Sequence, residues 1–460
     1  MMKHACWTWK ALLVLGLSAG LSVHAGATGD TYDDPAAKLP VCAADPTWIT
    51  NPSLPTEIPG GGENFCQFYQ FAWQTFLYLV SPSGNAGGDR NFEVQTNYPT
   101  LRASGIDSCK APPAGPQLFV RTAKPEFADG KFIIPERIDQ AGDNATIYDQ
   151  NGNVVFYDVR FDRGLCSASD SGDLPAGTTE LKSSWRELKD GETGYFTMQA
   201  VIVGAAKKPT NLGLIGFHLF RTTEQHPEGV WMTWEHASNV PDCLKPAATP
   251  PGGWSFTSSQ CAQCLATSSN GTLGCPSCNF NEASKNPHLM GTPSEICRVY
   301  RDGTAPKDHK AAENFRDVTS LNHQLVGPNG LLAKADPTLD MGIWQNYFNV
   351  GGLWVSDPSQ SASTSNQRGS LQLSNTTMET TFQGDFKASG SSFVRTGAVN
   401  CFGCHNYVPG QTATSGLSHI FGEIHGKSSN DQAAEAGGHT LRFVTAVQPQ
   451  PAHAVTGQDR

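Results

Sequence analysis

Five consecutive residues carry the most specific chemistry in the chain: Cys401-Phe402-Gly403-Cys404-His405. The pattern C-x-x-C-H is the attachment signal of a c-type haem. Two thiols at this spacing reach the two vinyl groups of one haem and form thioethers, and the histidine after them is held under the iron as proximal ligand. The alternative is a chance pair of thiols followed by histidine. We expect one covalent haem c on Cys401 and Cys404, with His405 on the iron.

The motif does not define the sixth ligand of the iron. No methionine follows Cys404, so the usual downstream methionine ligand is excluded. Of the later histidines, His419 lies in the most apolar stretch, and it is the candidate sixth ligand. Met378 is the upstream alternative, and a residue from the strand region or an open position remains. The later histidines are His419, His425, His439 and His453.

Two histidines in the strand-like middle of the chain are further candidates for the haem pocket. In a strand, Met232, Trp234 and His236 share one face, and His218 lies opposite the face of Phe217. One interpretation places one of these histidines beside the haem. The other makes both of them hydrogen-bonded residues in or beside a core.

Four cysteines form a C-x2-C-x10-C-x2-C pattern, and no histidine follows either pair. They are therefore not further haem sites. Their spacing suits a zinc ion held by four thiolates, whereas an oxidising compartment favours two disulfides. In both cases we expect a structural role. The four residues are Cys261, Cys264, Cys275 and Cys278.

The amino-terminal residues predict export. Lys3 and Lys10 provide positive charge, residues 11–23 are apolar but short for a membrane span, and Val23-His24-Ala25 is a typical cleavage site. We expect a signal peptide at residues 1–25 and a periplasmic mature protein with no membrane span. Ten cysteines outside the signal peptide and the haem motif form an even number, which predicts disulfides. Cys243–Cys297 is the first pairing we expect, followed by Cys42–Cys66 and Cys109–Cys166.

Charge and composition limit the partners and the fold. Removing Lys3 and Lys10 takes the formal charge from −10 to −12, which argues against nucleic acid as a partner. Alternation in residues 154–161, 195–203, 212–220 and 230–236 predicts antiparallel strands, and phenylalanines at helical spacing in 64–79 predict a buried helix. We expect an α+β fold with a large, loop-rich core and a carboxyl-terminal haem-attachment segment. The predicted regions are 1–25 (signal peptide), 26–241 (mixed α+β), 242–297 (Cys-rich stapled insertion) and 298–460 (haem-bearing).

Four blocks of sequence resemble exported bacterial proteins that are described as cytochrome c family proteins. The resemblance is scattered over residues 64–425 and implies haem and electron transfer. The blocks are residues 71–76 (FAWQTF), 231–241 (WMTWEHASNVP), 375–379 (NTTME) and 400–405 (NCFGCH).

Motif and resemblance together predict a periplasmic mono-haem c-type cytochrome that transfers electrons to an unidentified redox partner. The alternative is a haem-dependent oxidoreductase, a peroxidase or oxygenase with an open or displaceable sixth ligand. The missing methionine favours this alternative, as does a scaffold much larger than an electron carrier needs. A third hypothesis is a binding or assembly protein in which haem is structural or sensory. The sequence names no substrate.

Overall fold

The structure is a computed structural model. The predicted signal peptide, the lead-in before Cys42 and the tail with His439 and His453 lie outside the residues that it describes. Within the described ranges no helix combines the length and apolar character needed to cross a membrane. These ranges are 42–84, 88–102, 105–110, 118–120, 126–128, 131–133, 147–170, 174–202, 210–243, 246–269, 271–281, 292–299, 309–383, 385–389, 392–396, 400–405, 407–410 and 414–426.

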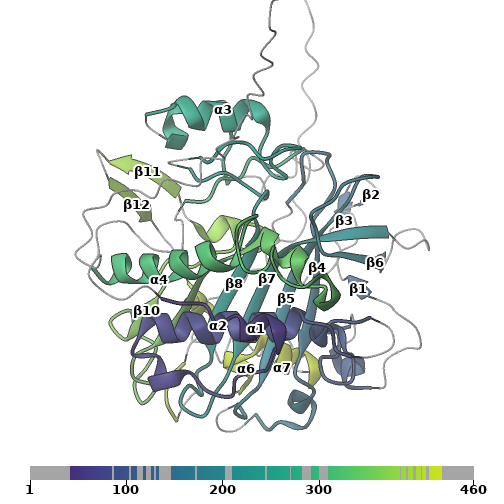
Figure 1. The fold of residues 1–460 in the computed structure, drawn as a ribbon, viewed down its shortest axis with the longest axis vertical. Helices are drawn as coiled ribbons and strands as arrows, with labels where there is room; N and C mark the ends of the chain where they lie inside the picture. The colour runs from purple at the N-terminus through teal and green to yellow at the C-terminus, as the bar shows by residue number, and fades with distance from the viewer. Residues whose placement is uncertain are drawn as a thin grey trace, which may run out of the picture. The chain divides into compact units, whose positions relative to one another are not determined.

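The fold is α+β, as predicted, and is built on one eight-stranded sheet (Figure 1). Seven strands pair antiparallel, and β1 pairs with β6 in parallel at one edge of the sheet. Because β8 pairs with β9, segments from both sides of the Cys-rich insertion share this sheet. The strands are β1 (Leu118–Val120), β4 (Phe156–Phe161), β5 (Thr179–Glu187), β6 (Thr197–Ile202), β7 (Thr210–Arg221), β8 (Val230–His236), β9 (Tyr347–Val355) and β10 (Gln367–Gly369).

Shorter elements surround the sheet. Two hairpins pair separately from it, β2 (Glu126–Ala128) with β3 (Lys131–Ile133) and β11 (Asp385–Ser389) with β12 (Ser392–Thr396). Three short helices, α5 to α7, come from the segment that carries the haem motif. The helices are α1 (Thr47–Thr50), α2 (Phe65–Val80), α3 (Ser259–Thr267), α4 (His309–Leu325), α5 (Cys401–Cys404), α6 (Thr414–Leu417) and α7 (His419–Ile424).

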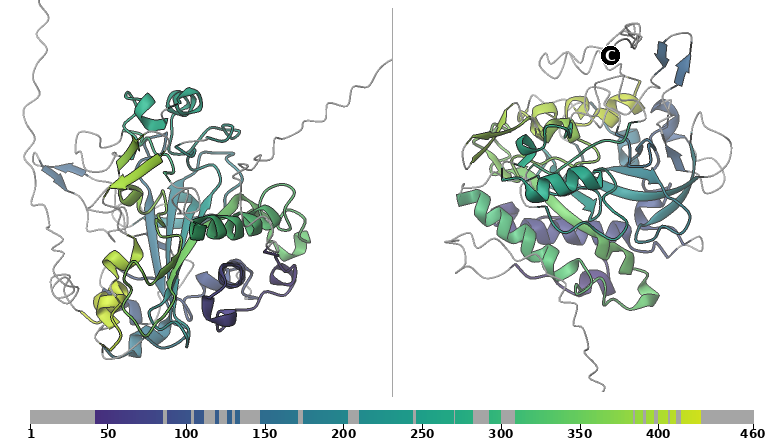
Figure 2. Two further views of the ribbon diagram at one scale, coloured as in Figure 1. Left: turned by 90° about the vertical axis from the view of Figure 1, so that its left-hand side faces the viewer. Right: turned by 90° about the horizontal axis from the view of Figure 1, so that it is seen from above.

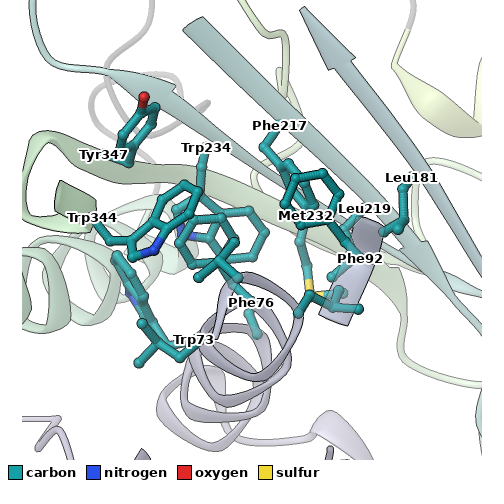
Figure 3. Close-up of a cluster of buried hydrophobic side chains, with 14 of the residues drawn as sticks. Trp73, Phe76, Phe92, Leu181, Phe217, Leu219, Met232, Trp234, Trp344 and Tyr347 are labelled. Atoms are coloured by element: carbon teal, nitrogen blue, oxygen red, sulfur yellow. The ribbon is translucent and has the colours of Figure 1, made fainter. Parts of the chain in front are cut away.

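Helices α2 and α4 cover one face of the sheet with an aromatic core (Figure 3). The side chain of Asn64 caps α2 by accepting hydrogen bonds from two amides of its first turn. Phe76 of α2 then stacks on Trp234 of β8, with ring centres 4.5 Å apart and an interplanar angle of 10°. Burial of these large rings supplies much of the hydrophobic stabilisation on this side of the sheet.

The opposite face of the sheet holds the carboxyl-terminal segment. Figure 2 shows this yellow segment on the side of the strands away from α2 and α4. Its residues Phe402, Leu417 and Ile420 pack in one hydrophobic cluster with Phe220 of β7 and Trp231 of β8. Alternation along the strands therefore decides which side chains meet the haem motif.

The Cys-rich insertion is stapled by disulfides, as predicted. Cys243–Cys297 closes its base, and Cys42–Cys66 and Cys109–Cys166 are also paired as expected. The four inner cysteines form two nested disulfides, so their sulfurs are not the four thiolates that the zinc alternative requires. No cluster suited to a metal ion occurs among the described His, Cys, Asp and Glu residues. The inner pairs are Cys261–Cys278 and Cys264–Cys275.

Removing the outer disulfide should destabilise the protein more than removing the shortest inner one. Cys243–Cys297 spans 54 residues and Cys264–Cys275 spans 11. In the chain-entropy model a double alanine variant of the outer pair loses roughly 4 kcal/mol of unfolding free energy, and one of the inner pair loses about 3 kcal/mol or less. Chemical denaturation of the two variants measures the difference. An inner pair that costs more than the outer one would contradict this prediction.

Candidate functional site

The haem motif forms a single helical turn, α5, that is anchored to the loop after β10. The His405 amide donates to the Cys401 carbonyl at 2.8 Å, which closes the turn. The side-chain amide of Asn400 donates to Gln367 Oε1 at 2.6 Å and to the Leu371 carbonyl at 3.1 Å. These contacts hold the turn against the sheet while leaving Gly403 exposed and Cys401 half-buried.

His405 is buried and oriented through one ring nitrogen. Its Nδ1 lies 2.8 Å from the carbonyl oxygen of Leu417, which can only accept, so Nδ1 carries the proton and Nε2 keeps its lone pair. Burial, together with the nearby His419, lowers the pKa of His405 well below its usual range. A neutral imidazole whose other nitrogen donates to a carbonyl is the usual arrangement of a histidine that binds a metal.

Two rings flank the His405 imidazole. Trp231 lies with its ring centre 4.4 Å away, and His419 stacks at the same centre-to-centre distance with an interplanar angle of 24°. The structure thus brings together the predicted proximal ligand and the candidate sixth ligand. Because the rings stack, His419 lies beside the imidazole of His405 rather than in line with its ring plane.

The strands present two rows of side chains on this face. One row pairs Lys182, His218 and Thr233 across β5, β7 and β8, and the adjacent row pairs Glu180, Phe220 and Trp231. An ammonium, an imidazole, a carboxylate and an indole are therefore built into the sheet beside the motif. Of these residues, only His218 was predicted from the sequence as a candidate for the haem pocket.

Glu180 links the sheet to the helix that follows the motif. It accepts a hydrogen bond from the hydroxyl of Ser418, which also caps α7 by accepting from the Phe421 amide at 3.0 Å. Burial raises the pKa of Glu180 to about 7, against the lowering effect of this hydrogen bond. The carboxyl group thereby anchors Ser418, the residue next to Leu417, whose carbonyl orients His405.

The conformation of the loop at residues 375–379 depends on the same strands. Asn375 donates to the Thr233 hydroxyl at 2.7 Å, and the Thr376 amide donates to Glu235 Oε1 at 2.7 Å. A side chain at Gly216 would place its Cβ 2.5 Å from the hydroxyl of Thr377, so this approach requires glycine. Three of the four blocks that carry the family resemblance therefore meet on this face of the sheet.

His218 and His236 have different surroundings. His236 shares its face with Met232 and Trp234, as predicted, and both its ring nitrogens have hydrogen-bond partners, the Gly194 carbonyl at 2.9 Å and the Ser238 hydroxyl at 2.8 Å. Burial lowers the pKa of His236 to about 4. His236 is therefore a core residue whose two ring nitrogens are both hydrogen-bonded, and it takes no part in the site around the haem motif.

His218 is buried without such partners. Its Nδ1 has no hydrogen-bond partner among the described residues and lies 3.7 Å from Glu379 Oε1. Burial, with the Lys182 ammonium nearby, lowers the pKa of His218 to about 3, so the ring is neutral at ordinary pH. Its ring centre lies 6.0 Å from that of Trp231.

The remaining candidate ligands lie elsewhere or are occupied. Met378 is buried in a separate cluster with Ile215 and Tyr157, not in the one that contains Phe402. His425 is exposed, and its Nε2 lies 2.9 Å from the Leu165 carbonyl. The candidates for the sixth position are therefore His419, a strand residue and an open position.

The residues of this face fit a covalently attached haem. The cluster around Phe402 supplies the apolar contacts that the macrocycle needs, and His405 offers a lone pair at Nε2. The indole Nε1 of Trp231 is buried without a partner among the described residues, and Lys182 is close by. An N–H donor and an ammonium could both bind the carboxylates of haem propionates.

A surface cavity of about 540 Å³ lies beside another histidine, His226, but it offers no ring nitrogen that could bind a ligand. Its lining includes Gly61, His226 and Ser356. Both ring nitrogens of His226 are used, Nδ1 with Glu228 Oε1 at 2.7 Å and Nε2 with the Gly61 carbonyl at 3.0 Å. This histidine is therefore not open to a ligand.

Comparisons of the chain with family models, with curated proteins and with solved structures find no match. The function must therefore be inferred from the residues of the site itself.

Proposed function

We propose that this protein is a periplasmic mono-haem c-type cytochrome that transfers electrons, with haem bound by Cys401, Cys404 and His405. The observation that carries the proposal is the state of His405: it is buried and neutral, and its Nδ1 is held by the Leu417 carbonyl. The neutral ring of His405 keeps the Nε2 lone pair for the iron, whereas His226 and His236 use both ring nitrogens in hydrogen bonds. The five disulfides agree with an exported protein.

The exposure of the motif turn supports transfer of electrons to another protein. Gly403 is exposed and Cys401 half-buried, so the edge of a haem attached there would lie near the surface. Haem supplies a one-electron change between ferric and ferrous iron. The protein orients the proximal imidazole through Leu417 and excludes water with Phe402 and Ile420.

A haem-dependent oxidoreductase is the second candidate, and the polar rows of the sheet favour it. An electron carrier does not need a carboxyl group with a pKa near 7 and a lysine beside its haem, and Glu180 and Lys182 supply these groups. Such groups are suited to proton transfer during catalysis.

Absorption spectra of the purified full-length protein separate the two candidates. For an electron carrier we expect a low-spin spectrum in both oxidation states, and no change when CO is added to the reduced protein. A high-spin ferric form that binds CO after reduction would instead support catalysis at an open position. A protein isolated from an oxidising compartment without any haem absorption would refute both candidates.

A further inference from the structure

His218 is a buried polar side chain of this face with an unsatisfied ring nitrogen. It is 6% exposed, and its Nδ1 has no hydrogen-bond partner among the described residues. An unsatisfied buried polar atom destabilises the folded protein and calls for an explanation such as an absent ligand or ion. The other buried histidines of the sheet region, His226 and His236, have partners at both ring nitrogens.

His218 lies near His405. Trp231 is a common neighbour of both histidines, with its ring centre 4.4 Å from that of His405 and 6.0 Å from that of His218. His218 comes from β7, which is paired on both sides by β5 and β8, whereas His405 comes from the attached segment. Two imidazoles from separate elements therefore lie close to the same indole, and the sheet holds one of them rigidly.

Glu379 provides the carboxylate that a histidine ligand commonly has behind it. Its Oε1 is 3.7 Å from His218 Nδ1, and its Oε2 accepts from the Asn375 amide at 2.7 Å, which holds the carboxylate in place. If the two side chains moved slightly closer together, the Nδ1–H of His218 would donate a hydrogen bond to the Glu379 carboxylate, and Nε2 would keep its lone pair. A carboxylate or carbonyl at Nδ1 is the typical outer-shell partner of a metal-binding histidine, and Leu417 gives His405 the same support.

We propose that His218 is the second axial ligand of the haem iron, opposite His405, and that Glu379 orients it. This inference rests on the proposed function, because it requires haem at Cys401 and Cys404. The face-to-face stacking of His419 on His405 places His419 beside the proximal imidazole, while an axial ligand must lie across the macrocycle from it. His419 then shields the proximal ring, and Met378 stays in its own cluster.

The test is the ferric spectrum of the full-length haem protein with single substitutions. The wild type should be low-spin. His218→Ala should convert it to high-spin, should bind CO once reduced, and should regain the low-spin spectrum when imidazole is added. His218→Met should show the weak far-red charge-transfer band of methionine ligation. These spectral signatures depend on the ligand to iron, and a merely structural histidine would not produce them.

His419→Ala and Met378→Leu are the rival variants, and His323→Ala is the control at an exposed histidine of α4. All three should keep the low-spin spectrum. If His218→Ala does not accumulate, His218→Met decides, because it preserves much of the side-chain volume. A wild type that is already high-spin, a low-spin spectrum unchanged in both His218 variants, or its loss in His419→Ala would overturn the assignment alone. A wild type without haem would overturn the proposed function with it.

Discussion

Replacing both Cys401 and Cys404 by alanine should abolish covalent haem attachment completely. Each thioether needs one of the two sulfurs, and the motif is the only C-x-x-C-H in the chain. We expect wild-type protein to stain for haem on a denaturing gel, and we expect no stain from the double variant at equal loading. Since noncovalently bound haem is lost under denaturing conditions, the stain reports the thioether bonds themselves.

A second pair of cysteines supplies the matched control for this experiment. Cys264→Ala/Cys275→Ala removes two sulfurs that form a disulfide, so it should leave the haem stain intact. Haem stain that persists in the Cys401→Ala/Cys404→Ala variant would refute the attachment site. Loss of stain in the control variant as well would mean that misfolding, rather than missing thioethers, prevents attachment.

The elements with a strong apolar period could be predicted from the sequence. The phenylalanines of α2 and the alternation in β7 and β8 correspond to surfaces that face the aromatic core. Strand β5 was not predicted because its sequence, TELKSSWRE, carries polar residues toward the face that the carboxyl-terminal segment covers, where Glu180 and Lys182 are buried or half-buried by tertiary contacts. Alternation cannot reveal a strand whose second face is both polar and covered.

The haem motif was evident from sequence, but its surroundings were not. Alternation placed His218 and His236 on opposite sides of their strands, yet it could not tell which side the haem segment covers. That choice depends on the long-range packing of Phe402 and Ile420 against Trp231, which no local pattern encodes. The disulfide Cys243–Cys297 was predictable because its cysteines stand where the composition changes.

A buried cluster of charged residues connects the base of the Cys-rich insertion to the face of the sheet that packs against the haem motif. The Arg298 guanidinium lies 2.7 Å from Glu235 Oε2 and 2.9 Å from Asp242 Oδ1, and it covers the ring of Phe348 at 4.8 Å. Glu235 is fully buried on β8 and also accepts from the amide and hydroxyl of Thr376. One arginine therefore neutralises the carboxylate that positions the loop at residues 375–379.

Arg298→Met should lower the free energy of unfolding by about 3–5 kcal/mol, because it leaves the Glu235 carboxylate buried without its counter-ion. Chemical denaturation measures the loss, and Lys110→Met is the control, since it breaks an exposed pair with Asp107 that contributes at most about 1 kcal/mol. Adding Glu235→Gln to Arg298→Met should recover part of the stability, because the amide removes the uncompensated charge while still accepting from Thr376. An Arg298→Met cost no larger than that of Lys110→Met would contradict the assigned role of this ion pair.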